Sequence, residues 1–226
     1  TLDRVPLEYF ERALAWLRAR PGVDEDCLAV CGVSRGGELA LLLGATFSTV
    51  RAVVAYVPSG SLWGAYPSNL HSAWTWRGEE LPAARLSVEE REALEASVRM
   101  QQEPHLVYGA ILANEAIVRD TAIPVEKTQG PILMISGDAD GLWPATALTR
   151  VAERRLQNCR FSHGFEHLVY PDAGHAIGIP NVITSTTRFK QAVSGEDLDL
   201  GGSSGGTARA SRDAWPRVLA FLAQSL

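Results

Sequence analysis

The sequence predicts a single α/β domain over residues 1–226, with a mainly parallel sheet and helices on both of its faces. Short apolar runs alternate with amphipathic helical stretches along the chain, a pattern typical of parallel sheets that are buried on both sides. The length of 226 residues suits one domain. The composition, 46% hydrophobic and 21% charged, is that of a folded protein with a sizeable core.

The first expected element is a helix over residues 6–20. Pro6 suits the first helical position, and Pro21-Gly22 ends the helix. Apolar side chains recur there at helical spacing, at Leu7, Phe10, Leu14 and Leu17.

Four apolar runs then predict strands, and the stretches between them predict helices. The strands are expected at residues 28–33, 51–57, 131–136 and 165–170, and the helices at 35–45, 144–156 and 212–226. In the closing helix we expect Trp215, Val218, Leu219 and Leu222 to face inward.

Two stretches interrupt the alternation. Residues 61–128 form a long, cap-like insertion between the second and third strands, with a helix expected to open at the capping box Ser87-Val88-Glu89-Glu90. Residues 194–208 are rich in Gly and Ser and predict a mobile surface loop before the last helix.

Charge and composition exclude several classes of partner. The net charge is −5 and no Lys/Arg run stands out, which argues against nucleic acid or an anionic membrane as the main partner. No apolar stretch approaches the length of a membrane span, and no signal peptide is recognised. The oligomeric state is not predicted.

The three cysteines have no paired spacing, so we expect reduced, buried thiols in a cytoplasmic protein, with Cys27 and Cys31 sharing one face of a strand. No metal site or cofactor is expected. The chain opens directly into a helix and has no initiator Met, so we expect its start to be a cut.

The pentapeptide Gly32-Val33-Ser34-Arg35-Gly36 is the strongest catalytic signal. It lies between an apolar strand and a helix, which is the context of a nucleophile elbow. The two glycines are expected to let strand and helix approach where a β-carbon would clash. Ser34 is therefore the candidate nucleophile.

A serine nucleophile needs a base, and the base needs an acid to hold its tautomer. Asp138 and Asp140 follow the third strand, and we prefer Asp140 because it lies further into the loop. The alternative is that an aspartate here only caps the next helix. His175 follows the fourth strand in a loop bent by Gly174 and is the candidate base.

The other histidines compete poorly. His71 and His105 lie in the insertion, and they either line a pocket or are exposed. His163 and His167 have the spacing of a metal pair on a helix, but Gly164 and the strand that follows argue against a helix there.

An oxyanion hole requires two backbone donors. The N–H of Arg35, directly after the nucleophile, is one candidate. The second donor normally follows an earlier strand, and the sequence shows no such strand before Pro6.

These motifs resemble the C-terminal catalytic domain of acyl-CoA thioesterases and bile acid-CoA:amino acid N-acyltransferases over almost the whole chain. The matching segments are 6–11, 32–39 with Arg35 where Lys is usual, 123–127, 137–143 and 170–175. The resemblance implies an α/β-hydrolase fold, places the acid on Asp140, and implies acyl-CoA thioester substrates. It also implies early strands that are absent here, so that the strand from Leu28 has a bare apolar edge.

The resemblance further implies a serine in the hydrolases and a cysteine in the amino-acid transferases. Ser34 therefore favours hydrolysis of fatty acyl-CoA through an acyl-Ser34 intermediate. The alternatives are a carboxylester or dienelactone-type hydrolase, an N-acyltransferase, and a non-catalytic fragment. Trp63, Trp74 and Trp76 in the insertion are expected either to form an apolar acyl pocket or to pack as ordinary core.

Overall fold

The core of the molecule is a four-stranded parallel sheet. A computed structural model describes residues 1–66, 69–85, 87, 89, 104–178, 187–190, 195 and 197–226. The sheet has the order β2-β3-β6-β7, and every neighbouring pair is parallel. Its strands are β2 (Ala29–Val33), β3 (Ala52–Tyr56), β6 (Ile132–Gly137) and β7 (Phe165–Tyr170). The four expected strands are thus confirmed, β7 with the bounds expected.

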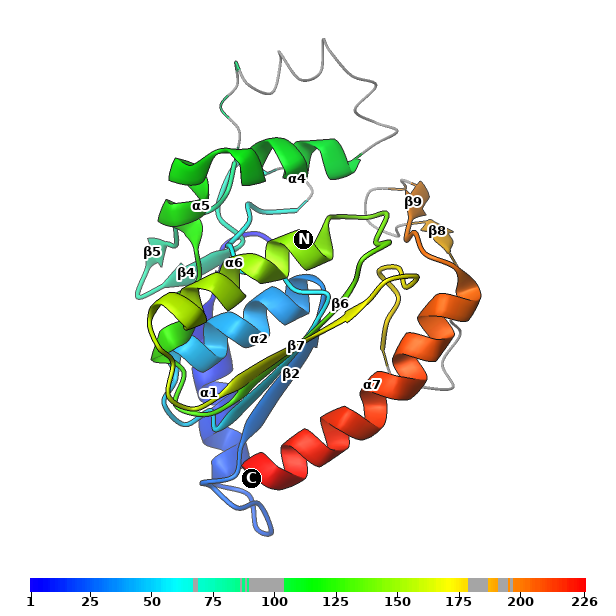
Figure 1. Cartoon of the computed structure of the whole chain (residues 1–226). Helices are drawn as coiled ribbons and strands as arrows, with labels where there is room; N and C mark the ends of the chain where they lie inside the picture. Colours follow the sequence, from blue (N-terminus) through cyan, green and yellow to red (C-terminus); the bar gives the residue numbers. More distant parts are fainter. Residues whose placement is uncertain are drawn as a thin grey trace.

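Helices cover both faces of this sheet, as expected. Helices α2 (Arg35–Thr46) and α6 (Ala145–Asn158) lie on one face, and α7 (Ser204–Ser225) crosses the other (Figure 1). Side chains alternate along the strands, so Val53 and Ile132 join the core under α2 and α6. Val54 and Leu133 join the core under α7.

A smaller layer packs beside the central sheet. Strand β1 (Val5–Pro6) precedes α1 (Leu7–Arg18) and pairs with β4 (Trp74–Trp76), which pairs with β5 (Glu79–Glu80). The insertion continues through α4 (Pro104–Ala113), α5 (Glu115–Thr121) and the 3₁₀ turn η2 (Val125–Lys127). The helix expected to open at Ser87 falls largely outside the described residues.

The closing helix is longer than the sequence predicts, because α7 begins at Ser204 rather than at residue 212. Ser203 caps it, accepting the N–H of Gly206 at 2.9 Å. A β-carbon on Gly206 would collide with the Asp172 carbonyl, so glycine is required for this close approach. The buried stripe of α7 consists mostly of small residues, namely Gly206, Thr207, Ala210, Ser211, Ala214 and Val218.

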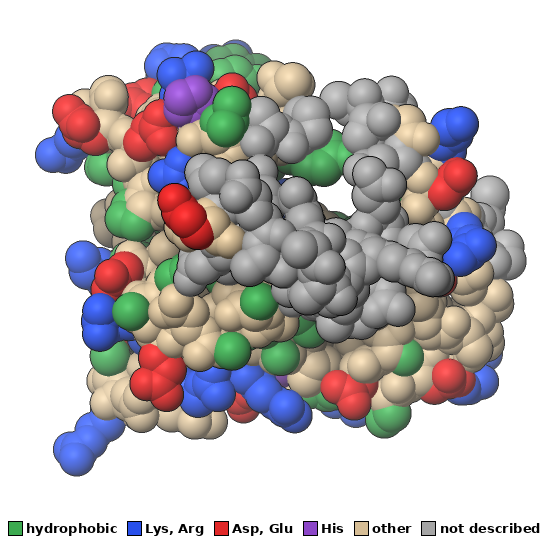
Figure 2. Space-filling view, turned by 90° about the horizontal axis from the view of Figure 1, so that it is seen from above, with side chains coloured by type: hydrophobic (Ala, Val, Ile, Leu, Met, Phe, Trp, Pro, Cys, Tyr) green, Lys and Arg blue, Asp and Glu red, His purple; other side chains and the backbone are tan. Residues whose placement is uncertain are grey.

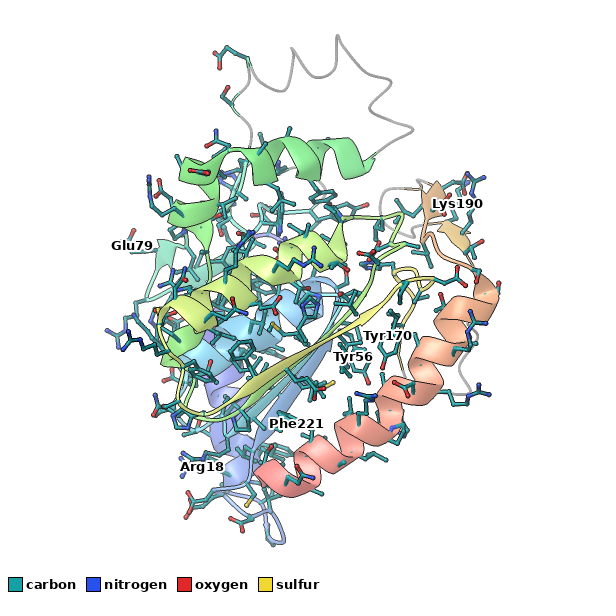
Figure 3. The ribbon with its side chains drawn as sticks, viewed as in Figure 1. Arg18, Tyr56, Glu79, Tyr170, Lys190 and Phe221 are labelled. Atoms are coloured by element: carbon teal, nitrogen blue, oxygen red, sulfur yellow. The ribbon has the colours of Figure 1, made fainter. Side chains whose placement is uncertain are left out.

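Leu219 was expected to face inward, but its exposed fraction is 50%. The buried side of α7 is set by the stripe that ends at Val218, which turns Leu219 to solvent. Trp215 and Leu222 are half-buried against the core. Phe221 and the pair Tyr56 and Tyr170 lie on the α7 side of the sheet (Figure 3).

The Gly/Ser-rich stretch 194–208 is not a plain loop where it is described. Strand β9 (Asp197–Asp199) pairs with β8 (Arg188–Lys190), and α7 takes up the stretch from Ser204. Between them, residues 200–203 lie against the loops that follow β6 and β7. The small residues serve tight packing here, and residues 197–199 and 204–208 belong to β9 and α7 rather than to a loop.

The expected burial of the cysteines is also wrong. Cys31 and Cys159 are exposed, and Cys27 is half-buried. Cys31 lies on the edge strand β2, whose outer side has no neighbouring strand among the described residues. Cys27 precedes this strand and donates to the carbonyl of Leu226 at 3.0 Å. The cytoplasmic location inferred from these cysteines stays a prediction.

An apolar groove lies beside β2. The groove has a volume of about 360 Å³ and lies between β2, α1 and α2. Its lining includes Phe10, Val30, Cys31, Leu39 and Leu43.

Among the described residues, no helix has the length and apolarity to cross a bilayer. Positive and negative side chains are mixed around the described rim of the face in Figure 2.

Candidate active site

The candidate catalytic residues lie at one edge of the central sheet. Ser34 directly follows β2, Asp140 follows β6, and His175 follows β7. Because these strands are parallel, their carboxyl ends share one edge, where open α/β sheets bind ligands. The topology therefore brings the three predicted side chains to the same end of the molecule.

Ser34 occupies a strained turn between β2 and α2. Its backbone angles are φ 58° and ψ −122°, a conformation that residues other than glycine rarely adopt. Its N–H donates to the carbonyl of Tyr56 at 2.9 Å, and its own carbonyl accepts the N–H of Glu38 at 3.0 Å. These two hydrogen bonds hold the sharp reversal of the chain from both sides.

Only one glycine of the pentapeptide serves the expected close approach. A β-carbon on Gly32 would collide with the carbonyl of Gly36, whereas one on Gly36 would meet open space. The second close approach belongs to Gly37, where a β-carbon would stand 2.8 Å from the carbonyl oxygen of Tyr56. The expectation is therefore right for Gly32 and wrong for Gly36, since it is Gly37 that packs on β3.

Asp140 and His175 form a buried hydrogen-bonded pair. Asp140 Oδ2 lies 2.7 Å from His175 Nδ1, and the exposed fractions of the two side chains are 1% and 9%. An ionised carboxylate only accepts hydrogen bonds, so Nδ1 carries the hydrogen and Nε2 is left with a free lone pair. This is the tautomer that a general base requires.

The second carboxylate oxygen of Asp140 fixes the acid loop. Oδ1 accepts the N–H of Leu142 at 2.9 Å and that of Trp143 at 3.2 Å. The aspartate thus also closes the turn before α6. A capping role of this kind was the alternative that the sequence analysis left open. Asp138, by contrast, is exposed.

The remaining histidines lie elsewhere. His71 pairs with Glu80 at 3.2 Å, and the ring of His163 lies tilted against that of Phe161. The side chain of His105 is outside the described part. His167 lies within β7, so the strand that argued against a metal-binding helix is present. The described residues contain no group of three or more His, Cys, Asp or Glu able to hold a metal ion.

The backbone of residues 200–202, which we call the backbone wedge, supports the loops that carry Asp140 and His175. The sequence analysis did not predict this contact. The carbonyl of Leu200 accepts the N–H of His175 at 2.7 Å and the N–H of Gly141 at 3.2 Å. Gly201 and Gly202 follow with φ of 64° and 66°. A β-carbon on Gly201 would strike the carbonyl of Ala139, and one on Gly202 would strike the nitrogen of Gly174. The pair of glycines is the only local signal for this contact.

Aromatic rings lead from the insertion to the base. The ring centroids of Trp63 and Tyr108 are 4.8 Å apart, those of Tyr108 and Trp143 5.7 Å, and those of Trp143 and His175 5.6 Å. All three contacts are edge-on, the geometry that aromatic pairs prefer. We call Trp63, Tyr108 and Trp143 the aromatic row.

Trp74 and Trp76 do not join the aromatic row. Trp74 is buried against Phe10, and Trp76 packs on Phe47. Both belong to the core on the α2 side of the sheet. They therefore follow the second alternative of the sequence analysis, ordinary core packing rather than an acyl pocket. Of the three tryptophans expected together, only Trp63 lies in the row.

The start of α2 supplies a backbone donor beside Ser34. The N–H of Arg35 belongs to the first turn, where helical N–H groups have no intrahelical acceptor. The positive end of the helix dipole favours negative charge at this position. In the described part of the central sheet, no strand precedes β2.

Comparison with known sequences gives a family match over nearly the whole chain and relatives that cover all of it. Residues 5–226 match the family described as BAAT / acyl-CoA thioester hydrolase, C terminal. Rattus norvegicus acyl-coenzyme A thioesterase 2, mitochondrial, is 28% identical over 229 residues, which cover 100% of this chain and 46% of the relative. Homo sapiens acyl-coenzyme A thioesterase 6 is 28% identical over 100% of this chain and 50% of its own.

The peroxisomal succinyl-coenzyme A thioesterase of Mus musculus is 27% identical, again over 100% of this chain and 50% of the relative. The chain therefore spans about half the length of the curated relatives that it matches.

Solved structures give the fold. An acylaminoacyl peptidase from Pyrococcus horikoshii superimposes with a TM-score of 0.53 at 12% identity, covering 97% of this chain and 27% of its own. A candidate dienelactone hydrolase from Klebsiella pneumoniae superimposes with a TM-score of 0.52 at 18% identity, covering 96% of this chain and 60% of its own. The chain has the α/β-hydrolase fold.

Proposed function

Since this chain belongs to the BAAT / acyl-CoA thioester hydrolase C-terminal family, we propose that it hydrolyses fatty acyl-CoA thioesters through an acyl-Ser34 intermediate. The observation that carries the proposal is the buried Asp140–His175 pair, 2.7 Å apart, at the sheet edge where Ser34 occupies its strained turn. Family membership supports the substrate class, and the paired groups support a serine mechanism.

The first half of the proposed reaction acylates the enzyme. Ser34 Oγ attacks the thioester carbonyl while His175 Nε2 takes its proton. The N–H of Arg35 donates to the oxyanion of the tetrahedral intermediate. The C–S bond then breaks, the CoA sulfur takes the proton from His175, and acyl-Ser34 remains.

The second half returns the free enzyme. His175 Nε2 takes a proton from water, which attacks the Ser34 ester. The ester C–O bond breaks, Ser34 Oγ recovers the proton, and the fatty acid leaves. Throughout both halves Asp140 holds the imidazole and stabilises its protonated form.

The aromatic row is the candidate wall for the acyl chain. Trp143 lies against His175 and Tyr108 lies against Trp143, so the row begins at the base and runs toward α4. Trp63 and Trp143 are buried in the core and Tyr108 is partly buried against it, so Tyr108 is the ring of the row that an acyl chain could contact. Replacing Tyr108 with Ala is expected to raise KM for palmitoyl-CoA more than KM for a short acyl-CoA.

Thiol release from palmitoyl-CoA tests the reaction directly. Wild-type protein is compared with Ser34→Ala and with Ser136→Ala, in which a fully buried serine is removed. Loss of turnover in Ser34→Ala but not in Ser136→Ala supports the proposal. Equal rates in wild type and Ser34→Ala would contradict it.

Two further measurements separate the alternatives. A fluorophosphonate that labels Ser34 in a protein inactive on acyl-CoA would retain the serine mechanism but reject the substrate. In that case p-nitrophenyl esters of matched chain length test for a carboxylester hydrolase. Mass spectrometry for acyl-glycine or acyl-taurine tests for transfer to an amine. No labelling at all would identify a non-catalytic scaffold.

A further inference from the structure

A fully buried carboxylate lies one helical turn after the candidate nucleophile. Glu38 in α2 has no exposed surface, and both of its carboxylate oxygens have partners. Oε2 accepts from Arg35 Nη1 at 2.8 Å, and Oε1 accepts from Trp74 Nε1 at 2.7 Å. The N–H of Trp63 approaches Oε1 at 3.4 Å. The carboxylate thus joins α2 to two segments of the insertion.

The guanidinium of Arg35 continues this connection. Its Nη2 donates to the carbonyls of Trp63 and Gly64, each at 3.1 Å. The planar fork of arginine can satisfy the carboxylate and the two carbonyls at once, whereas the single ammonium of lysine is a point charge. The arginine at this position therefore matches the contacts that the structure shows.

The side chain and the backbone N–H of Arg35 thus have different surroundings. Its side chain is held by Glu38, Trp63 and Gly64, and its backbone N–H lies at the turn that carries Ser34. A rotation of the first turn of α2 would move that N–H and would also break the side-chain contacts. The orientation of the donor is therefore tied to the ion pair.

Stability alone is a weak reason for such a pair. Burial raises the pKa of Glu38, against the opposing effects of Arg35 and of the Trp74 and Trp63 donors. Moving two charges out of water commonly costs as much as their attraction returns, whereas removing one partner leaves the other uncompensated. A pair of this kind at the nucleophile turn is better explained by the geometry that it fixes.

We propose that the Glu38–Arg35 pair is a positioning device that sets the direction of the Arg35 N–H toward the oxyanion. This inference rests on the proposed function. The Glu38 carboxylate is fully buried and the Arg35 guanidinium is held by Glu38, Trp63 and Gly64, so both groups act through the backbone of the turn. The pair therefore affects stabilisation of the transition state more than binding of the ground state.

Glu38→Gln is the main test, because glutamine keeps an acceptor for Trp74 but loses the charge for Arg35. We expect kcat for palmitoyl-CoA to fall about 10- to 100-fold, less than the roughly 10²- to 10³-fold loss when an oxyanion donor is removed outright, with KM within about twofold. The affinity for an acyl trifluoromethyl ketone, which forms an oxyanion adduct with serine, is expected to fall by the same factor.

The matched control is Arg155→Gln. Arg155 pairs with Glu126, with Nη2 2.8 Å from Oε1, and joins α6 to η2 away from the nucleophile turn. This variant is expected to lose stability but to keep kcat. Equal losses of kcat in Glu38→Gln and Arg155→Gln, or a rise in KM with kcat unchanged, would overturn the positioning role.

Two further measurements keep the test decisive. Arg35→Lys retains a positive charge but loses the fork, so we expect an intermediate fall in kcat, and this variant decides if Glu38→Gln does not fold. The rate of fluorophosphonate labelling at Ser34 is measured in every protein. If wild type is labelled but does not hydrolyse acyl-CoA, the substrate proposal fails and the ratio of labelling rates decides the role of the pair. If wild type is not labelled, both proposals fail.

Discussion

Two histidine–carboxylate pairs lie close to each other in sequence, and only one has the surroundings of a catalytic site. His175 meets Asp140 in loops beyond the ends of β7 and β6. His167, within β7, meets Glu153 of α6 at 3.2 Å and also lies 2.8 Å from Ser136 Oγ. By its contacts alone the second group is the more complete serine–histidine–acid arrangement. In the described part of the chain, no hydrogen bond joins Ser34 to His175.

The surroundings of the two serines differ. Ser136 lies within β6, is fully buried, and also bonds Thr146 at 3.0 Å. Ser34 lies on a strained turn at the carboxyl edge of the sheet, and it is half-exposed. A substrate carbonyl can reach Ser34 but not Ser136. Position at the sheet edge and a strained, accessible turn therefore identify the candidate nucleophile better than hydrogen-bond distances do.

The strongest test of this comparison replaces each histidine in turn. His175→Gln is expected to lower kcat for palmitoyl-CoA by about 10⁴-fold or more, because the serine loses its base. His167→Gln is expected to stay within about threefold of wild type while losing stability. Steady-state thiol release and urea unfolding measure the two effects. If both variants are folded but inactive, the Asp140–His175 pair and the group around His167 are functionally coupled.

The acid loop gives the next largest effect. Asp140→Asn is expected to lower kcat by about 10³- to 10⁴-fold, since an amide no longer fixes the tautomer of His175. Asp138→Asn changes an exposed neighbour in the same loop and is expected to leave kcat unchanged. Parallel kcat measurements on both variants decide between the two aspartates, and the reverse ranking would assign the acid to Asp138.

The backbone wedge should give a smaller effect. Gly202→Ala places a methyl group against the nitrogen of Gly174, so the loop that carries His175 must shift, and kcat is expected to fall about 10- to 100-fold, as for small misplacements of catalytic groups. Gly164→Ala is the control, because Gly164 also has a positive φ, of 82°, but a β-carbon there meets nothing within 4 Å. If the two variants lose the same activity, backbone strain rather than the wedge is responsible.

The smallest effect concerns pH. Burial lowers the pKa of His167 below its usual value, assisted by the charge of Arg150 and opposed by Glu153. Below a pH of about 6.5 the unfolded histidine binds a proton that the folded one resists. The free energy of unfolding should therefore fall as the pH drops from about 6.5 toward the lower folded pKa. Urea unfolding at several pH values should show a weaker decline in His167→Gln, and an unchanged profile would contradict this.

Local patterns predicted most of the fold. Apolar periodicity predicted the four parallel strands and the helices that follow β2 and β6, and Pro and Gly predicted the ends of several elements. Both signals depend only on residues that are neighbours in the sequence. The order of serine, acid and base, each after a strand of the parallel sheet, predicted the candidate site, since parallel strands bring their carboxyl ends together. The contact between Asp140 and His175 agrees with that prediction.

Two features escaped prediction because they depend on contacts between distant segments of the chain. Residues 201–206 look like a linker because they are small, yet the glycines are required because backbones approach closely at Gly201, Gly202 and Gly206. The Glu38 network was likewise hidden, because its partners come from the insertion, far along the chain. Composition cannot distinguish a glycine that loosens a loop from a glycine that admits a neighbouring backbone.

The wedge at Leu200 also has a consequence for the order of events during synthesis. The carbonyl that holds both the acid loop and the base emerges from the ribosome after all four strands of the central sheet, just ahead of α7. A nascent chain can therefore pair its strands while its acid and base loops are still unsupported, because contacts between distant segments form late. We expect catalytic competence to appear only when α7 docks, so that a nascent chain that stops before α7 carries the sheet but not yet a working site.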